Sequence, residues 1–207
     1  MVICGLGLAL AGPAAAAEYL IAFDEGKGDQ TTAQGEPPLE GDVVKAQWAE
    51  GKKGNALQFN DYGNNLEKPK VSDATFVEFK HHEALVPKAK VSISAWVWVE
   101  RRGFFYGGIV EKGGGFGAAY RLGLLRNGVV KASVGNELLS VESPKPLSLK
   151  EWHELKMIYD GTRLTLAIDG EEVASQEKAV AKFANADRLI LGNRFTGKID
   201  EVQIKVE

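Results

Sequence analysis

Short runs in which apolar and polar residues alternate fill most of this chain. The clearest lie within residues 151–206, where four such runs are separated by Asp160-Gly161, Asp169-Gly170, Gly192 and Gly197. Alternation with a period of two is typical of a strand with one buried face. Asp-Gly dipeptides favour tight hairpin turns, because both residues tolerate a positive φ. This segment therefore predicts an antiparallel meander.

The strongest strand pattern upstream covers residues 91–99. Its first half alternates apolar residues with serine, and its second half is apolar on both faces. A strand that is apolar on both faces is expected in the middle of a sheet, covered on both sides. The pattern therefore predicts a central strand with Trp96 in the core.

Further strand patterns cover residues 19–23, 43–48, 55–59, 75–79, 107–112, 120–125 and 129–134. Arg126-Asn127-Gly128 predicts a hairpin between the last two, and residues 31–42, with two prolines, predict an extended loop. No helix-period run is longer than about a dozen residues. Many short strands between Gly-rich turns predict an all-β fold, a two-sheet antiparallel sandwich.

The first 17 residues, MVICGLGLALAGPAAAA, are apolar and mostly small. The segment is too short to span a bilayer as a helix, and it resembles the hydrophobic region of a signal peptide with cleavage near Ala16 or Ala17. A disordered apolar tail is the alternative, because the usual basic residue is missing. We expect a leader at residues 1–17, one domain at 18–207 without a stable membrane span, and a secreted, periplasmic or cell-surface location.

Charge and cysteine content exclude some functions. The net charge is −3 and the isoelectric point is about 5.8, so no basic field exists to hold a nucleic-acid backbone. Cys4 is the single cysteine, which excludes an internal disulfide and a cysteine-based metal site.

Several short motifs follow one another in a defined order. They are Phe23-Asp24-Glu25-Gly26, Gly51-x-x-Gly54-x-Ala56-Leu57-x-Phe59, the strand at 91–97, Tyr120-Arg121-Leu122, Trp152-His153, Ile168-Asp169-Gly170 and Gly197-x-Ile199-Asp200-Glu201-Val202. In this order they resemble the concanavalin A-like lectin/glucanase superfamily, specifically the laminin G-like domains of bacterial exported proteins. The resemblance covers residues 19–206 and implies a jelly-roll sandwich. It leaves function open, since the superfamily includes lectins, glycosidases, polysaccharide lyases and adhesion domains.

Paired carboxylates are missing from the strand patterns. A retaining glycosidase needs two carboxyl groups about 5 Å apart, which on one strand requires an even spacing. Glucanase relatives carry Glu-x-Asp-x-x-Glu, which this chain lacks, and the adjacent Asp200 and Glu201 point to opposite faces. Lyase relatives need Arg, His and Tyr together, an alternative that Tyr120-Arg121 and Trp152-His153 keep open. We predict no catalytic residue.

The resemblance also implies one structural calcium ion. In jelly-roll relatives the ligands come from the N-terminal turn, a carbonyl before the second motif and the aspartate of the closing strand. The matching positions are Asp24, Gly54 and Asp200, and hard oxygen ligands suit Ca²⁺. The alternative is that Asp24 is a turn residue and Asp200 a hydrogen-bond acceptor for neighbouring backbone.

Aromatic residues are the candidates for sugar binding, because pyranose rings stack on them. We select Trp98, Tyr106 and Tyr120 as carbohydrate-binding residues. Tyr106 ends the triplet Phe104-Phe105-Tyr106, which would form an unusual apolar patch if it were exposed. The alternative is that members of the triplet pack under the next strand.

These features together predict a non-catalytic extracellular binding module for a carbohydrate or a surface protein. Two alternatives stay open: an exported polysaccharide hydrolase or lyase of the same fold, and a structural domain without a small ligand.

Overall fold

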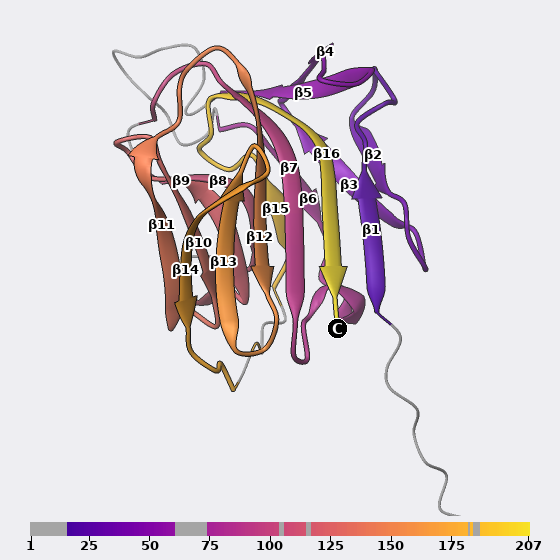
Figure 1. Cartoon of the computed structure of the whole chain (residues 1–207). Helices are drawn as coiled ribbons and strands as arrows, with labels where there is room; N and C mark the ends of the chain where they lie inside the picture. The colour runs from indigo at the N-terminus through magenta and orange to yellow at the C-terminus, as the bar shows by residue number, and fades with distance from the viewer. Residues whose placement is uncertain (1–15, 61–73, 104–105, 115–116, 182, 184–186) are drawn as a thin grey trace, which may run out of the picture.

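The computed structural model describes residues 16–60, 74–103, 106–114, 117–181, 183 and 187–207. Within them the chain forms two antiparallel sheets of eight strands each, stacked face to face (Figure 1). These ranges also contain a short 3₁₀ turn, η2 (Glu83–Leu85). The predicted all-β jelly-roll sandwich is confirmed. No helix in this part of the chain has the length and apolar character that a membrane crossing requires.

Sheet A lies in front in Figure 1. Its strands, in spatial order, are β14 (Glu171–Glu177), β13 (Arg163–Ile168), β12 (Trp152–Tyr159), β7 (Val91–Val99), β16 (Gly197–Val206), β5 (Asn55–Phe59) and β4 (Gln47–Glu50). β1 (Ala17–Ile21) also pairs with β16.

Sheet B lies behind it. Its strands, in spatial order, are β11 (Leu139–Pro146), β10 (Val129–Val134), β9 (Tyr120–Leu124), β8 (Gly107–Lys112), β15 (Leu189–Leu191), β6 (Phe76–Phe79), β3 (Leu39–Val44) and β2 (Gln30–Ala33).

The predicted C-terminal meander is confirmed in its first part and wrong in its second. β12, β13 and β14 are successive neighbours, with Asp169 and Gly170 both at positive φ in the second turn. β15 instead lies in sheet B between β8 and β6, and β16 returns to sheet A between β7 and β5. Alternation determines which face of a strand is buried, but it carries no information on which sheet the strand joins.

Two other expectations need correction. β7 is central, but it alternates buried and partly exposed residues along its whole length, so Trp96 lies on the outer face and not in the core. The predicted loop at 31–42 contains β2 and most of β3. β2 escaped the pattern because its buried positions are Thr31 and Ala33, which carry little hydrophobic signal.

The predicted leader stays a prediction, because residues 1–15 lie outside the described part of the chain. Its last residue, Ala17, already belongs to β1 and pairs with Val206 at the end of β16. β1 therefore includes the last residue of the predicted leader.

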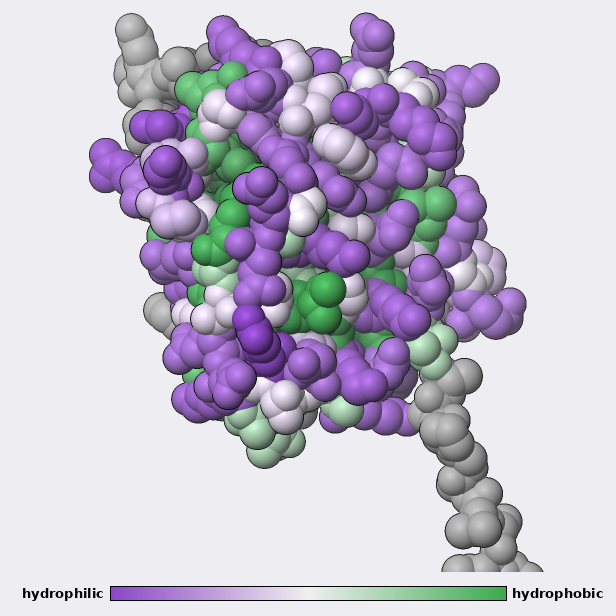
Figure 2. Space-filling view, viewed as in Figure 1, coloured by the Kyte–Doolittle hydropathy of each residue, from purple (hydrophilic) through white to green (hydrophobic). Residues whose placement is uncertain are grey.

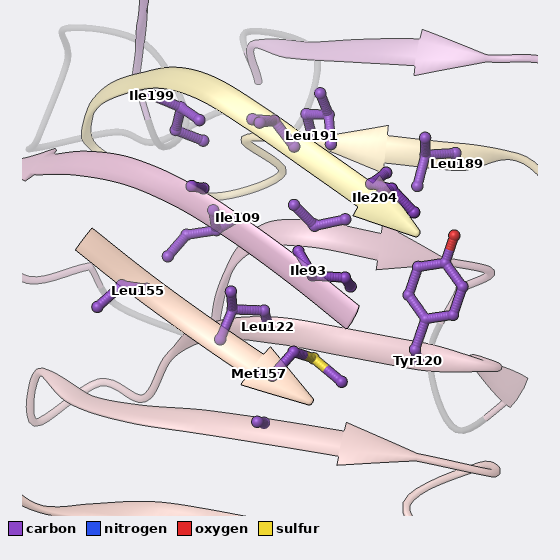
Figure 3. Close-up of a cluster of buried hydrophobic side chains, with 14 of the residues drawn as sticks. Ile93, Ile109, Tyr120, Leu122, Leu155, Met157, Leu189, Leu191, Ile199 and Ile204 are labelled. Carbon is purple, nitrogen blue, oxygen red and sulfur yellow. The ribbon is translucent and has the colours of Figure 1, made fainter. Parts of the chain in front are cut away.

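The core fills the space between the inner faces of the two sheets. Figure 3 shows Ile93, Leu155 and Ile204 of sheet A facing Ile109, Leu122 and Leu191 of sheet B, and all are fully buried. Burying one such aliphatic side chain contributes about 1.5–3 kcal/mol. The outer face of sheet A is mostly hydrophilic, with separate hydrophobic patches (Figure 2). Period-two alternation thus places one hydrophobic layer inside and polar side chains outside.

Two glycines test this packing directly. Gly192 and Gly170 both have positive φ, 75° and 84°. A Cβ at Gly192 would meet the ring of the buried Phe59 at 2.1 Å, whereas one at Gly170 would meet nothing within 4 Å. We expect Gly170→Ala to lower the free energy of unfolding by about 1 kcal/mol, through backbone strain alone. Gly192→Ala should cost about 3 kcal/mol or more, because the overpacked ring must shift. Urea denaturation measures both losses, and equal losses would contradict the packing.

Candidate functional site

One end of the sandwich gathers the side chains of interest. β7 and β9 end there, and β8, β10 and β16 begin there, because neighbouring strands run antiparallel. We call the described residues 100–103, 106, 125–128 and 192–196 the rim. Backbone hydrogen bonds tie its loops together: Glu100 N–H donates to Thr196 O at 3.1 Å, and Gly108 N–H donates to Asn193 O at 2.8 Å. These hydrogen bonds join the loop before β16 to residues that follow β7 and begin β8.

An open depression in the rim is lined by Tyr106, Leu125, Arg126 and Asn127. The last three belong to the β9–β10 hairpin, which was predicted from the Asn-Gly pair. Gly128 N–H donates to Leu125 O at 2.8 Å, and Val129 N–H donates to Asn127 Oδ1 at 3.1 Å. The depression combines an aromatic ring, an aliphatic side chain, an exposed guanidinium and an amide. Such a mixture of apolar surface and convergent polar groups is typical of ligand sites.

A narrow cleft of about 10 Å³ adjoins the depression and shares Leu125 with it. Its walls include Arg101, Arg102 and Arg194, so cationic side chains dominate this part of the rim. A volume of this size holds about one water molecule, and no ligand ring enters it.

A network of charged side chains supports Tyr106 from below. Arg121 NH2 lies 2.7 Å from Glu111 Oε1, and its NH1 lies 2.7 Å from Glu137 Oε1. Lys131 adds a second contact to Glu137 at 3.1 Å, and Glu111 is almost fully buried. Both carboxylates therefore contact cationic side chains of neighbouring strands.

Tyr106 is positioned by this network and by the space that Gly123 leaves for its ring. The Arg121 guanidinium lies 4.2 Å from the centroid of the Tyr106 ring. A Cβ at Gly123 would meet the Tyr106 hydroxyl at 2.5 Å, so only glycine leaves room for the ring. Burial raises the pKa of Tyr106, which keeps the hydroxyl neutral. Sequence reasoning missed this network. The sequence pattern places Glu111, Arg121 and Lys131 on the outward faces of their strands, which is the signal that could have found the network. The alternation does not tell which of these strands are neighbours.

The structure does not bring the three predicted aromatic residues together. Tyr106 lies in the depression, and its neighbours Phe104 and Phe105 lie outside the described residues. Tyr120 is fully buried in the core and has no exposed surface. Trp98 lies on the outer face of sheet A, 6.0 Å from Trp152 in a T-shaped pair. Tyr106 is therefore the one of the three that lines the depression.

The ring of Trp98 is engaged by other parts of the chain. Lys198 Nζ lies 5.4 Å from the centroid of the Trp98 ring and donates to Glu50 O at 3.1 Å. Trp98 Nε1 donates to Glu100 Oε2 at 3.2 Å. These contacts occupy the polar edge and one face of the indole, which leaves less of it for a sugar ring.

The three predicted calcium ligands converge on one turn. Gly51 N–H donates to Gly54 O at 3.1 Å and closes this turn. Asp24 Oδ1 accepts a hydrogen bond from Asn55 N–H at 3.3 Å, directly after the turn. Asp200 reaches the same turn from β16. The turn therefore joins the N-terminal and C-terminal parts of the domain.

Asp200 is fully buried and anchors the turn through three backbone donors. Its Oδ2 accepts from the N–H groups of Lys52 and Lys53 at 2.8 and 2.9 Å, and its Oδ1 accepts from Glu201 N–H at 2.8 Å. Burial raises the pKa of Asp200, and these hydrogen bonds oppose the rise.

Backbone donors, and not oxygen ligands, thus surround the Asp200 carboxylate. The described ranges contain no group of three or more His, Cys, Asp or Glu side chains placed to hold a metal. This arrangement does not fit a calcium ion bound by Asp200 Oδ2. It matches the alternative in which Asp200 bonds neighbouring backbone, and calcium stays a prediction from the resemblance.

Ser148, His153 and Asp169 form a hydrogen-bonded chain beside the rim. Ser148 Oγ lies 2.8 Å from His153 Nε2, and His153 Nδ1 lies 2.7 Å from Asp169 Oδ2. Serine hydrolases use this order, but neither the depression nor the cleft includes Ser148. Asp169 also accepts from Glu154 N–H at 2.8 Å and donates its own N–H to Glu154 O at 2.9 Å. These contacts hold the β13–β14 turn against β12.

Comparison with protein families gives one match. A family model described as the concanavalin A-like lectin/glucanases superfamily matches residues 72–205. No curated protein matches the chain in sequence.

Solved structures share the fold at low sequence identity. Domain 4 of AbnA, an extracellular arabinanase from Geobacillus stearothermophilus crystallised with arabinotriose, is 17% identical with a TM-score of 0.63, and the match covers 92% of this chain and 93% of that one. A botulinum neurotoxin type C structure, described as interacting with two ganglioside molecules, is 11% identical with a TM-score of 0.66, covering 91% and 47%. Trypanosoma rangeli sialidase is 12% identical with a TM-score of 0.64, covering 90% and 30%. At these identities the likeness shows the fold alone.

The role of Asp200 can be measured. Asp200→Asn replaces one acceptor oxygen by an NH₂ group that faces backbone N–H donors, so we expect it to lower the free energy of unfolding by about 2–4 kcal/mol. Glu201→Gln, at the next position, should change it by less than about 1 kcal/mol, because it keeps the size of the side chain and removes only an ion pair with Lys53, whose side chain is 72% exposed. Thermal melting of both variants measures the difference, and similar losses would contradict the anchoring role. Melting with and without EDTA tests calcium in the same samples: a chelator-dependent drop supports the ion, while no drop and no calcium by elemental analysis removes it.

Proposed function

The chain belongs to the concanavalin A-like lectin/glucanases superfamily, and on this premise we propose that it is a non-catalytic carbohydrate-binding module of an exported protein. The arabinanase domain with arabinotriose and the ganglioside-binding toxin support this choice, since both use the fold in proteins that contact sugars. A surface protein is the alternative partner, because a related toxin structure was solved with synaptotagmin II.

The depression at the rim is the observation that carries the proposal. Leu125 and the Tyr106 ring offer apolar surface for the C–H face of a pyranose, while Asn127 and Arg126 offer hydrogen-bond donors for its hydroxyls. An open depression suits an internal unit of a long glycan, because both ends of the polymer can leave it.

Other grooves in the described part of the chain are less suitable. One follows the outer edge of sheet B and is lined by Gln30, Thr32, Pro38, Leu39, Glu40, Asp42, Lys80, His81 and His82. It lacks a phenyl, phenol or indole ring on which a sugar stacks. The rim depression is therefore the preferred site.

The described carboxylates support a role without catalysis. Glu111 and Glu137 share Arg121, and Asp200 is enclosed by backbone N–H groups. A glycosidase of the retaining or inverting type needs one carboxyl group ready to donate a proton and another free to attack or activate water. These three carboxylates are instead engaged in contacts within the fold, and no two of them are placed as such a pair by their contacts.

Glycan binding is tested on purified protein with a glycan array, followed by calorimetry on the best ligand. We expect Tyr106→Ala to weaken binding about tenfold, since lost stacking of a ring costs about 1–1.5 kcal/mol. Leu125→Ala should also weaken binding, because it removes apolar surface that the sugar would cover. Leu125→Ala serves as the second variant in case Tyr106→Ala disturbs folding, because Leu125 is partly exposed. Trp98→Phe, on the outer face of sheet A, is the control and should bind as wild type. Loss of binding in the control alone would move the site to sheet A.

Ser148 allows a test of the non-catalytic proposal. We expect the protein to be unreactive towards a fluorophosphonate probe and to release no product from p-nitrophenyl acetate beyond the rate of Ser148→Ala. The reason is that a serine nucleophile also needs a substrate cleft and oxyanion donors. Labelling of wild type that disappears in Ser148→Ala and in Asp169→Asn would contradict the proposal and identify a hydrolase.

A further inference from the structure

The distribution of arginine points to the chemical class of the ligand. We propose that the rim depression selects acidic sugars, meaning glycans that carry a carboxylate, and that Arg102 and Arg126 bind this carboxylate. The inference rests on the proposed glycan-binding function and specifies its substrate class.

Arginine is concentrated at the rim. The chain has seven arginines, Arg101, Arg102, Arg121, Arg126, Arg163, Arg188 and Arg194. Four of them, Arg101, Arg102, Arg126 and Arg194, line the depression or the adjoining cleft. This concentration occurs in a protein whose net charge is −3, so the local positive field opposes the overall charge.

Arg102 and Arg126 differ from the arginines elsewhere in the fold. Arg163 pairs with Glu172 at 2.6 Å, and Arg188 pairs with Glu78 at 2.7 Å. Arg121 is held by two glutamates in the network under Tyr106. By contrast, no carboxylate within the described ranges pairs with Arg102 or Arg126, and both side chains are exposed.

These two arginines flank the same hairpin turn. Arg102 Nε lies 2.9 Å from the position that a Cβ would take at Gly128, the residue that ends the turn. Arg126 stands two residues earlier and lines the depression. Arg102, which lines the adjoining cleft, and Arg126, which lines the depression, therefore lie at the same turn.

Two acidic residues next to the rim, Glu100 and Glu111, contact other groups in the described part of the chain. Glu100 accepts from Trp98 Nε1 and lies 3.7 Å from Lys150, on the side of sheet A. Glu111 lies beneath the depression, where Arg121 and Asn193 already hold both of its oxygens. Both of these described carboxylates therefore already have partners within the fold.

A carboxylate on a pyranose ring matches these groups. A guanidinium binds a carboxylate through two parallel hydrogen bonds, which adds direction to the charge attraction. Tyr106 and Leu125 face the apolar side of the sugar, and Asn127 is placed for its hydroxyls. An acidic peptide would satisfy the arginines but would leave the ring-shaped apolar surface without a matching group.

The experiment compares an oligogalacturonate with the same oligosaccharide after its carboxyl groups are reduced to neutral alcohols. Binding of both to the purified chain is measured by calorimetry at about 50 and 200 mM salt, with poly-glutamate as a third probe. The variants are Arg102→Ala and Arg126→Ala, and the control is Arg163→Ala, which removes the same charge from β13 at a distant surface.

We expect the acidic oligomer to bind at least tenfold more tightly than the reduced one. Each rim variant should weaken acidic binding about tenfold, the loss of one charge-assisted hydrogen-bonded pair, and should lower the salt dependence. Arg163→Ala should change it less than twofold. Both rim side chains are exposed, so these variants are expected to fold, and melting curves check this.

The two proposals fail in different ways. Equal binding of the acidic and reduced oligomers, unaffected by the rim variants, overturns the acidic-sugar inference and leaves glycan binding standing. Binding of poly-glutamate in preference to both oligomers overturns it in favour of an acidic protein partner. Absence of binding to either oligomer and to every glycan on the array overturns the proposed function itself, and the inference with it.

Discussion

The buried carboxylate of Asp200 is the interaction on which the closure of sheet A depends. β16 pairs with β7 along one side, while its other side pairs first with β5 and then with β1. The register with β7 shifts between Asp200 and Gln203, where Glu201 has a φ of 47°. At this bulge three backbone N–H groups are drawn to Asp200, two of them from the 51–54 turn. A buried donor without a partner costs about 1–3 kcal/mol, so by accepting these hydrogen bonds the carboxylate stabilises both the bulge and the turn.

Backbone hydrogen bonds connect the rim to β16 and its neighbours. The residues just before β16, 192–196, form backbone hydrogen bonds with Glu100, which follows β7, and with Gly108, which lies in β8. Asn193 extends this loop into the charged network by donating to Glu111 at 3.0 Å. The network then positions Arg121 over the Tyr106 ring. A site with a preformed wall loses less conformational entropy on binding, which suits a module whose depression is open and shallow.

Much of this fold could be predicted from local pattern. The strands at 55–59, 107–112 and 129–134 have the bounds that alternation and glycine turns indicated. The Asn127-Gly128 hairpin was also predicted, and it carries Arg126 to the rim. The failures share one cause. β15 and β16 separate into different sheets, and Trp96 lies outside the core, because both depend on which strands become neighbours.

The sequence by itself determined the class of fold, the positions of most strands along the chain and the hairpin turn that carries Arg126, because these follow from side-chain alternation and from the backbone freedom of Asn, Asp and Gly. Only the tertiary structure decided what the charged residues do. Glu111, Arg121 and Glu137 meet across strands that the sequence separates, and Asp200 meets a turn nearly 150 positions away, at Lys52. Electrostatic interactions act over a few ångströms in space whatever the distance along the chain. Their partners are therefore defined by strand register and sheet order, which a single sequence does not encode locally.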